Sequence, residues 1–158
     1  MRKENMQQKL LEKLFARGRE FLGVEYPILG GAMSWISESN LVSAISNAGG
    51  FGVIAGGNMP PDLFDAEIRK TNDKTDKPFG INLITIAPNF RHHLDHVLDI
   101  EFPFVIFAGG LPPRDAIQRA KQAGCKVMCF APTVGLARQL IKIGVDALII
   151  EGHEAGGH

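Results

Sequence analysis

The last eight residues of the chain hold its densest group of side chains that could take part in catalysis. They combine two carboxylates, two imidazoles and three glycines, in the order Glu151-Gly152-His153-Glu154-Ala155-Gly156-Gly157-His158. Glycine lets backbone N–H groups approach an anion or a flat ring closely. A neighbouring histidine can act as a general base near neutral pH. The segment therefore fits a loop that binds an anion or a flat ring beside a general base, and a flexible, solvated chain end is the alternative that composition alone leaves open.

This segment follows the last of six short apolar runs, and small or polar clusters follow the other runs too. The runs are rich in Ile, Val and Phe and cover residues 26–33, 50–55, 78–84, 102–108, 126–131 and 145–150. Because they are too short for buried helices, each is predicted to be a β-strand.

Helical patterns separate these runs and carry recognisable start and stop signals. The predicted helices cover residues 37–48, 61–74, 90–99, 113–123 and 133–143. Ser37 and Thr133 are predicted N-caps, and Pro61 and Pro113 suit the first helical turn. Glycines 49, 124 and 144 stand where C-caps belong.

Alternating strands and helices predict a parallel α/β sheet with right-handed crossovers. A doubly wound sheet usually carries G-x-G-x-x-G after its first strand, and that pattern is absent. Small or polar clusters after every strand are instead typical of a (β/α)8 TIM barrel, whose active sites lie at the C-terminal rim. A closed barrel needs eight such units in about 250 residues. We therefore expect residues 19–158 to form the first six strands of a TIM barrel, incomplete at the C-terminus.

An amphipathic helix is predicted ahead of the barrel, in residues 1–18. Met6, Leu10, Leu11 and Leu14 recur at helical spacing, and Gly18 is the expected C-cap. Its polar face is mixed rather than basic, which argues against membrane binding. We expect this helix to cover the floor of the barrel.

Composition narrows the range of partners. The chain has 158 residues, with 17 basic and 17 acidic side chains, so its formal charge of zero argues against nucleic acid as the main partner. No apolar run approaches the roughly 18 residues that cross a bilayer. Cys125 and Cys129, without export context, favour a reducing cytoplasm. Because they bracket a buried strand, we expect two reduced core thiols rather than a redox pair.

Three further residues invite a functional interpretation. His92 and His96 are four residues apart on one predicted helical face, a spacing that a metal could use. With no third ligand nearby, a solvated helix face is the expected reading and no metal is predicted. Trp35 follows the first strand, where it either walls an active site or packs within the loop.

Four segments, in matching order and spacing, resemble the nitronate monooxygenase family, formerly called 2-nitropropane dioxygenases. They are Tyr26-Pro27-Ile28 through Met33, Ser46-Asn47-Ala48-Gly49-Gly50-Phe51-Gly52, Asp76-Lys77-Pro78-Phe79-Gly80-Ile81-Asn82 and Glu154-Ala155-Gly156-Gly157-His158. The resemblance runs from about residue 23 to the last residue. It extends to a related branch, the flavin-dependent enoyl-acyl-carrier-protein reductases. The family's fold is a TIM barrel that holds FMN.

The resemblance implies a role for eight residues. His158 matches the histidine that takes the proton α to a nitro group while the flavin accepts electrons. Asn82 matches an asparagine that hydrogen-bonds the cofactor, and Glu151 takes the place of a polar residue beside the flavin. The remaining five match backbone near the cofactor: Gly31, Ala32 and Met33 against the ring, and Gly156 and Gly157 near the FMN.

These matches imply an FMN-dependent oxidoreductase that oxidises alkyl nitronates with O2. The alternative within the resemblance is an enoyl-acyl-carrier-protein reductase of fatty acid synthesis that uses NAD(P)H. Gly56-Gly57-Asn58 and residues 131–137 look closer to that branch. The family's phosphate loops follow strands seven and eight, beyond His158, so tight FMN binding is not expected from this chain alone. A non-catalytic fragment that folds by self-association, or by pairing with a complementary half, is the alternative from another class.

Overall fold

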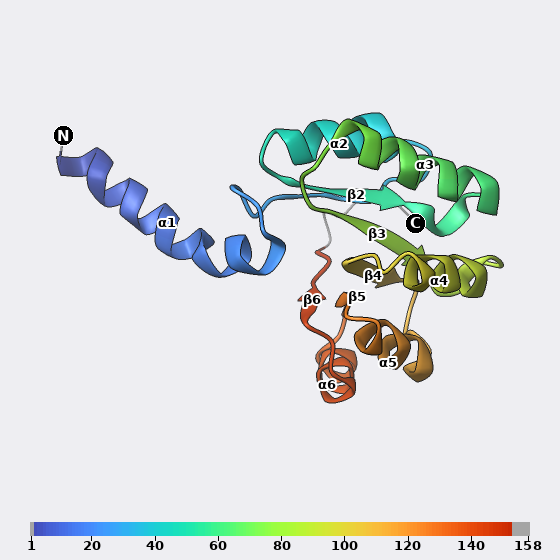
Figure 1. Ribbon diagram of the computed structural model, residues 1–158. Coiled ribbons are helices and arrows are strands. Elements are labelled where there is room, and N and C mark those ends of the chain that lie inside the picture. Colours follow the sequence, from blue (N-terminus) through green and yellow to red (C-terminus); the bar gives the residue numbers. More distant parts are fainter. Residues whose placement is uncertain (1, 153–158) are drawn as a thin grey trace.

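The computed structural model describes residues 2–152 of the chain, and side chains from residue 8 onward. Six parallel strands form one curved sheet whose spatial order equals their order in the chain (Figure 1). They are β1 (Leu29–Gly30), β2 (Phe51–Ala55), β3 (Phe79–Ile84), β4 (Phe104–Ala108), β5 (Lys126–Phe130) and β6 (Ala147–Ile149). A doubly wound sheet reverses its strand order, whereas a barrel adds each strand beside the last. The sheet is therefore part of a TIM barrel, as the sequence predicts.

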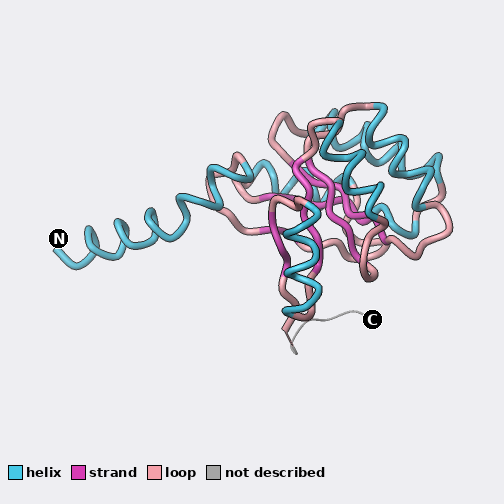
Figure 2. The backbone as a smooth tube through the Cα atoms, turned by 90° about the horizontal axis from the view of Figure 1, so that it is seen from below, coloured by secondary structure: helices cyan, strands magenta, loops and turns pink. Residues whose placement is uncertain are grey.

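Helices cover the outer side of this sheet, as Figures 1 and 2 show. They are α2 (Ser39–Asn47), α3 (Pro61–Lys74), α4 (Phe90–Asp99), α5 (Arg114–Gln122) and α6 (Val134–Ile143), and a 3-10 turn, η1 (Gly56–Asn58), follows β2. All five helices predicted between the strands are present.

The helix ends confirm some of the predicted caps and correct others. Thr133 caps α6 by accepting a 3.2 Å hydrogen bond from Leu136 N, and Gly144 ends that helix with φ of 103°. The N-cap of α2 is Glu38 rather than Ser37, and its carboxylate accepts from Asn40 N at 3.1 Å. The hydroxyl of Ser37 is instead bonded within the preceding loop.

The strand at one edge of the sheet is also shorter than the sequence predicts. The first strand is only two residues long, Leu29–Gly30, where the apolar run predicts residues 26–33. A strand at the sheet edge pairs on one side alone, and among the described residues Leu29 and Gly30 pair with Phe51 and Gly52 of β2. The apolar run therefore continues into loops at both ends.

Side chains alternate between two core layers along each strand, as a period of two requires. The larger layer lies between the sheet and the helices and includes Ile54, Ile81 and Phe107. The smaller layer lies on the inner face of the barrel and comprises Leu22, Phe51, Val53, Phe104, Ile106 and Met128.

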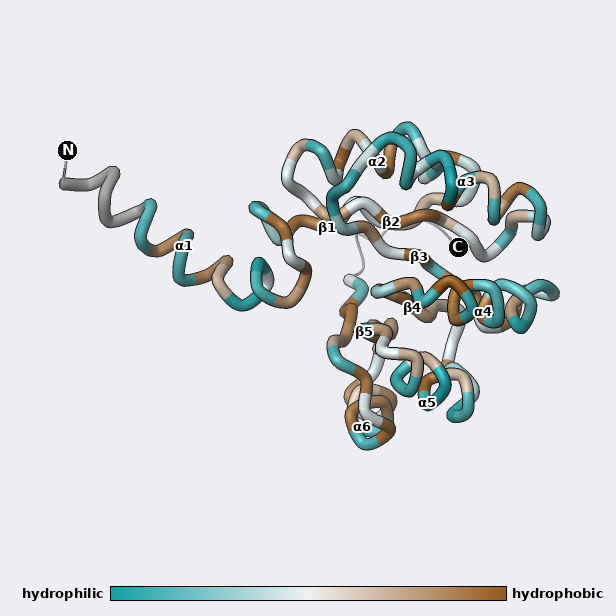
Figure 3. The backbone as a smooth tube through the Cα atoms, in the orientation of Figure 1, coloured by the Kyte–Doolittle hydropathy of each residue, from teal (hydrophilic) through white to brown (hydrophobic). Residues whose placement is uncertain are grey.

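The N-terminal helix α1 (Arg2–Leu22) extends away from the barrel, with polar and apolar residues alternating along it (Figures 1 and 3). Leu10, Leu11 and Leu14 are exposed, so the prediction that the helix covers the barrel floor is wrong for this part. Only the last turn does so, where Leu22 joins the inner layer. No helix among the described residues is long and apolar enough to cross a membrane.

The prediction that Gly18 ends this helix is also wrong. The helix continues to Leu22, and Gly23 follows it with φ of 71°. A Cβ at Gly18 would lie 2.6 Å from Pro27 Cβ, so glycine is needed there for close packing. That tertiary contact outweighs the helix penalty of glycine, which is about 1 kcal/mol.

Candidate functional site

The loops after the parallel strands all lie at the C-terminal rim of the sheet, where TIM barrels carry their active sites. Gly31, Ala32 and Met33 directly follow β1 and are exposed there. On the Cβ side of Gly31 the space is open, since a Cβ built there would have no neighbour within 4 Å. The backbone of this segment is therefore accessible to a ligand.

Asn82 of β3 lies on the inner face, near the same rim. Its register partners are Ala55 of β2 and Ile106 of β4. It alternates with Ile81 and Leu83 of the outer layer, so it shares the inner side with Ile106. The side chain is 6% exposed, and its Nδ2 donates a long hydrogen bond of 3.4 Å to the Ile106 carbonyl. A buried amide is thus placed among apolar neighbours below the rim.

Lys126 of β5 is the other polar side chain on the inner-facing positions of the described strands. It lies at the opposite, N-terminal end of the sheet, where its register partner is Phe104. Its ammonium donates to the carbonyl of Phe21 and lies 5.0 Å from the ring centroid of Phe104. This cation is satisfied by the last turn of α1 and faces away from the rim.

The predicted C-terminal residues are only partly within the described chain. Glu151 is exposed and follows β6, which ends at Ile149. Gly156, Gly157 and His158 lie outside the described residues, so their roles remain predictions. The structure thus places the segment of residues 31–33 and Asn82 toward the same end of the sheet.

Trp35 lies in the loop after β1 with a left-handed backbone, φ of 64°, and its indole is 65% exposed. It therefore does not pack within the strand-to-helix loop. A positive φ at a bulky residue is unusual and marks a conformation that surrounding contacts impose.

The sequence predicts that His92 and His96 of α4 both face solvent, and the structure agrees for one of them. His92 is exposed, as predicted, whereas His96 is half-buried with its Nε2 3.2 Å from Asp65 Oδ1. The sequence analysis missed His93, which is fully buried and stacks on Phe64 at 4.1 Å between ring centroids. Its position at i+3 from Phe90, on the apolar face of α4, was the available signal.

Burial disfavours the charged form of the His93 imidazole, and the charges of His92 and His96 disfavour it further. The pKa of His93 is therefore lowered to about 4. Neither ring nitrogen has a hydrogen-bond partner among the described residues. Among the side chains that the structure describes, from residue 8 to residue 152, no three ligating groups come together as a metal site would require.

Both cysteines are free and buried in the outer layer, which confirms the prediction of two reduced core thiols. Burial raises the pKa of Cys129 to about 12, so this thiol stays protonated. Cys125 donates to the Phe102 carbonyl at 3.0 Å.

Comparisons with curated proteins identify oxidoreductases of about twice this length or more. One relative is the (3aS,4S,5R,7aS)-5-hydroxy-7a-methyl-1-oxo-octahydro-1H-indene-4-carboxyl-CoA dehydrogenase of Mycobacterium tuberculosis, which is 36% identical over 142 residues, covering 88% of this chain and 39% of that protein. A probable nitronate monooxygenase of Staphylococcus aureus is 28% identical over 88% of this chain and 49% of its own length. The chain therefore spans half or less of the relatives it matches.

The chain also matches solved structures over half of their length or less. FabK from Thermotoga maritima superposes with a TM-score of 0.86 at 39% identity, over 90% of this chain and 45% of that one. The nitroalkane oxidase from Streptomyces ansochromogenes gives 0.82 at 28% identity, over 89% of this chain and 50% of that one.

A family model described as nitronate monooxygenase matches residues 16–92 and 84–158, nearly the whole chain. The fold, the relatives and this match agree with the resemblance of the four sequence segments. The chain belongs to the nitronate monooxygenase family.

Proposed function

We propose that this chain supplies the ring-binding side of an FMN-dependent oxidoreductase. The observation that carries the proposal is Asn82, a buried amide on the inner face of β3, in the half of the strand nearer the C-terminal rim, where residues 31–33 are exposed after β1. Ligand sites are typically apolar with a few placed polar groups, and a flavin is a flat ring with hydrogen-bonding atoms along its edge. The residues present fit that ring, because Ile106 offers an apolar wall and Asn82 an amide.

Each residue has a distinct part in this proposal. The backbone of Gly31, Ala32 and Met33 would lie against the ring, and Asn82 Nδ2 would donate a hydrogen bond to it. Glu151 would stand beside the ring, and Gly156 and Gly157 would contribute to the cofactor site. His158 takes the proton α to the nitro group of the substrate. When bound, FMN supplies the two-electron redox chemistry.

Two substrate classes follow from different observations. The family itself, and the nitroalkane oxidase at 28% identity, favour an alkyl nitronate with O2 as the second substrate. The 36% identity to a CoA-thioester dehydrogenase and the 39% identity to FabK favour a thioester with NAD(P)H, as in the enoyl-acyl-carrier-protein reductases. We place nitronate oxidation first, and we propose a cytoplasmic location because the two cysteines are free and buried in the fold.

Flavin binding is the first test. FMN is titrated into the purified chain, and the absorbance change of the flavin gives Kd; riboflavin, which lacks the phosphate, is titrated in parallel. Because the phosphate loops of the family follow strands seven and eight, we expect the two ligands to bind within about threefold of each other. A chain that binds neither ligand at about millimolar concentration would contradict the proposal and favour the non-catalytic alternative.

Asn82→Ala tests the assignment of the amide. Loss of one neutral hydrogen bond costs about 1 kcal/mol, so FMN affinity should fall about fivefold. Asn47→Ala is the matched control, because Asn47 is exposed and donates to the Lys74 carbonyl on the outer side of the sheet. Equal affinities of the two variants would refute the role of Asn82.

Turnover separates the substrate classes. Oxygen consumption with a nitronate, in the absence of a nicotinamide, supports the first; NADH oxidation that depends on a crotonyl thioester supports the second. His158→Ala should keep its flavin affinity and lose most activity toward a neutral nitroalkane, because that substrate must be deprotonated first. Unchanged turnover of this variant would exclude His158 as the base.

A further inference from the structure

The loop between β1 and α2 is held from the inside by Ser37, whose side chain is 2% exposed. Its hydroxyl donates to the Gly31 carbonyl at 2.9 Å and accepts from Met33 N at 3.0 Å. One buried side chain thus binds both ends of the segment of residues 31–33. Residues 31–33 are themselves exposed, so Ser37 connects this segment to the buried interior.

The backbone of Ser37 is fully bonded as well. Its N–H donates to the Met33 carbonyl at 2.9 Å, and its carbonyl accepts from Ala55 N at 3.0 Å, at the C-terminal end of β2. Two residues earlier, Trp35 has the unfavourable left-handed backbone. Such a conformation persists only where surrounding contacts over-determine it, and Ser37 makes several of those contacts.

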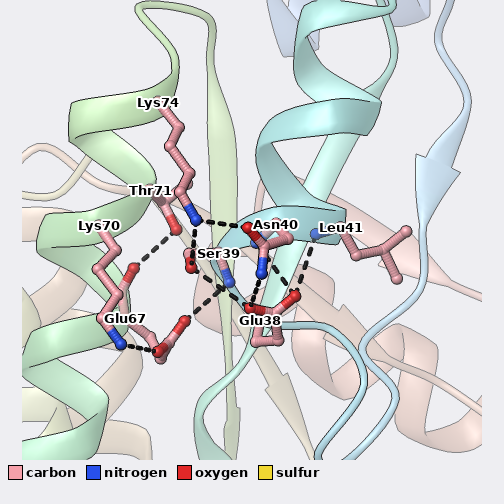
Figure 4. A network of polar contacts seen from close by, with 8 residues as sticks. All are labelled: Glu38, Ser39, Asn40, Leu41, Glu67, Lys70, Thr71 and Lys74. Atoms are coloured by element: carbon pink, nitrogen blue, oxygen red, sulfur yellow. Dashed lines mark hydrogen bonds and ion pairs between the residues drawn. The ribbon is translucent and has the colours of Figure 1, made fainter.

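A buried carboxylate fixes the start of α2, next to this loop (Figure 4). Glu67 of α3 accepts from Ser39 N at 2.8 Å and from Lys70 Nζ at 2.8 Å. Lys74 adds a 2.6 Å contact to Asn40 Oδ1. Burial raises the pKa of Glu67, but the hydrogen bonds from Lys70 and Ser39 outweigh it and the pKa is lowered, so the group stays charged. The loop is therefore attached to a fixed helix terminus.

We propose that Ser37 is a positioning residue of the cofactor site: its hydroxyl holds the backbone of residues 31–33 in the conformation that receives the flavin ring. This inference rests on the proposed function and adds a residue that does not itself touch the cofactor. A cofactor-facing segment held in advance loses less conformational entropy on binding, and its affinity is correspondingly higher.

Ser46 provides a matched control within the same chain. It is 1% exposed, donates to the Pro78 carbonyl at 3.0 Å and accepts from Gly52 N at 3.2 Å. The two serines therefore lose the same kinds of bonds when changed to alanine. The partners of Ser46 lie at the other end of the sheet, away from the rim, because Pro78 precedes β3 and Gly52 lies at the start of β2.

The experiment compares Ser37→Ala, Ser46→Ala and Ser37→Thr with the wild-type chain. We expect FMN Kd to rise about tenfold in Ser37→Ala, to stay within about twofold in Ser46→Ala, and to return close to the wild-type value in Ser37→Thr, which keeps the hydroxyl. Hydrogen exchange of the Met33 amide, measured without flavin, should accelerate only in Ser37→Ala, because that amide loses its acceptor.

The outcomes are separable. If Ser37→Ala and Ser46→Ala weaken FMN equally, or if Met33 exchange is unchanged in Ser37→Ala, the inference is wrong while the proposed function stands. A wild-type chain that binds no flavin would overturn the proposed function, and the exchange of Met33 would still decide whether Ser37 holds the loop.

Discussion

Substitution of Gly52 by alanine tests how closely α2 packs against the sheet. Gly52 lies in β2 and faces α2, and a Cβ built on it would lie 2.4 Å from Val42 O and 2.9 Å from Val42 Cα. Both atoms belong to the backbone of α2, so no side-chain rotation relieves the clash. Val42 itself is fully buried in the outer layer.

The cost follows from these distances. An ordinary contact of a Cβ begins near 3.4 Å, so α2 must move away from β2 by about 1 Å in a core that is close-packed. Overpacking of this kind costs roughly 1–3 kcal/mol. Because backbone atoms cause the clash, we expect the upper end of this range, which is a loss of about 3 kcal/mol in the free energy of unfolding.

Chemical denaturation of the chain measures this free energy, and Gly135→Ala is the control. Gly135 lies in the first turn of α6, with no heavy atom within 4 Å of a built Cβ. Alanine there should stabilise the protein by roughly 0.5 kcal/mol through helix propensity. A loss below about 1 kcal/mol in Gly52→Ala would refute the packing argument.

Three further predictions concern residues outside the rim. His93 has a pKa of about 4 in the folded chain and about 6.5 in the unfolded chain. The free energy of unfolding should therefore be highest above pH 6.5 and fall by about 3 kcal/mol toward pH 4, as the unfolded chain takes up a proton that the folded chain does not. His93→Phe keeps the stack on Phe64 and should flatten the denaturation profile between pH 6.5 and 5; an unchanged slope would contradict this. Leu14→Ser should change stability by less than about 0.5 kcal/mol in the same assay, since Leu14 is 66% exposed. Both cysteines should react with a thiol reagent only after unfolding, and labelling of the native chain would show that the core is open.

The repeated strands and helices were predictable because their signals are local. Each apolar run and each cap depends on residues within one or two turns, and the strand order then follows from the parallel connection rule. Gly18 was mispredicted because its reason is tertiary, the approach of Pro27. Likewise, Ser37 has the residue type of an N-cap, but its hydroxyl bonds Gly31 and Met33, and Glu38 takes the cap.

The candidate site was predictable only in part from the residues themselves. Asn82 came from the family resemblance, and the alternation of β3 then places it on the inner face. Ser37 had no sequence signal for its role, because a bond from a buried hydroxyl to a loop six residues away depends on how that loop folds. His93 was overlooked among adjacent polar residues, although Phe90, Leu94 and Val97 mark the same helical face.

The two polar side chains on the inner-facing strand positions indicate which end of the barrel is suited to a ligand. Lys126 is satisfied at the N-terminal end by the Phe21 carbonyl and by two aromatic rings. A carboxamide can take part in about four hydrogen bonds, two as donor and two as acceptor. The described residues give Asn82 one, at 3.4 Å, although it is 6% exposed. Since an incompletely bonded buried amide is costly, a partner that completes the hydrogen bonds of Asn82 gains affinity toward the C-terminal end of the sheet.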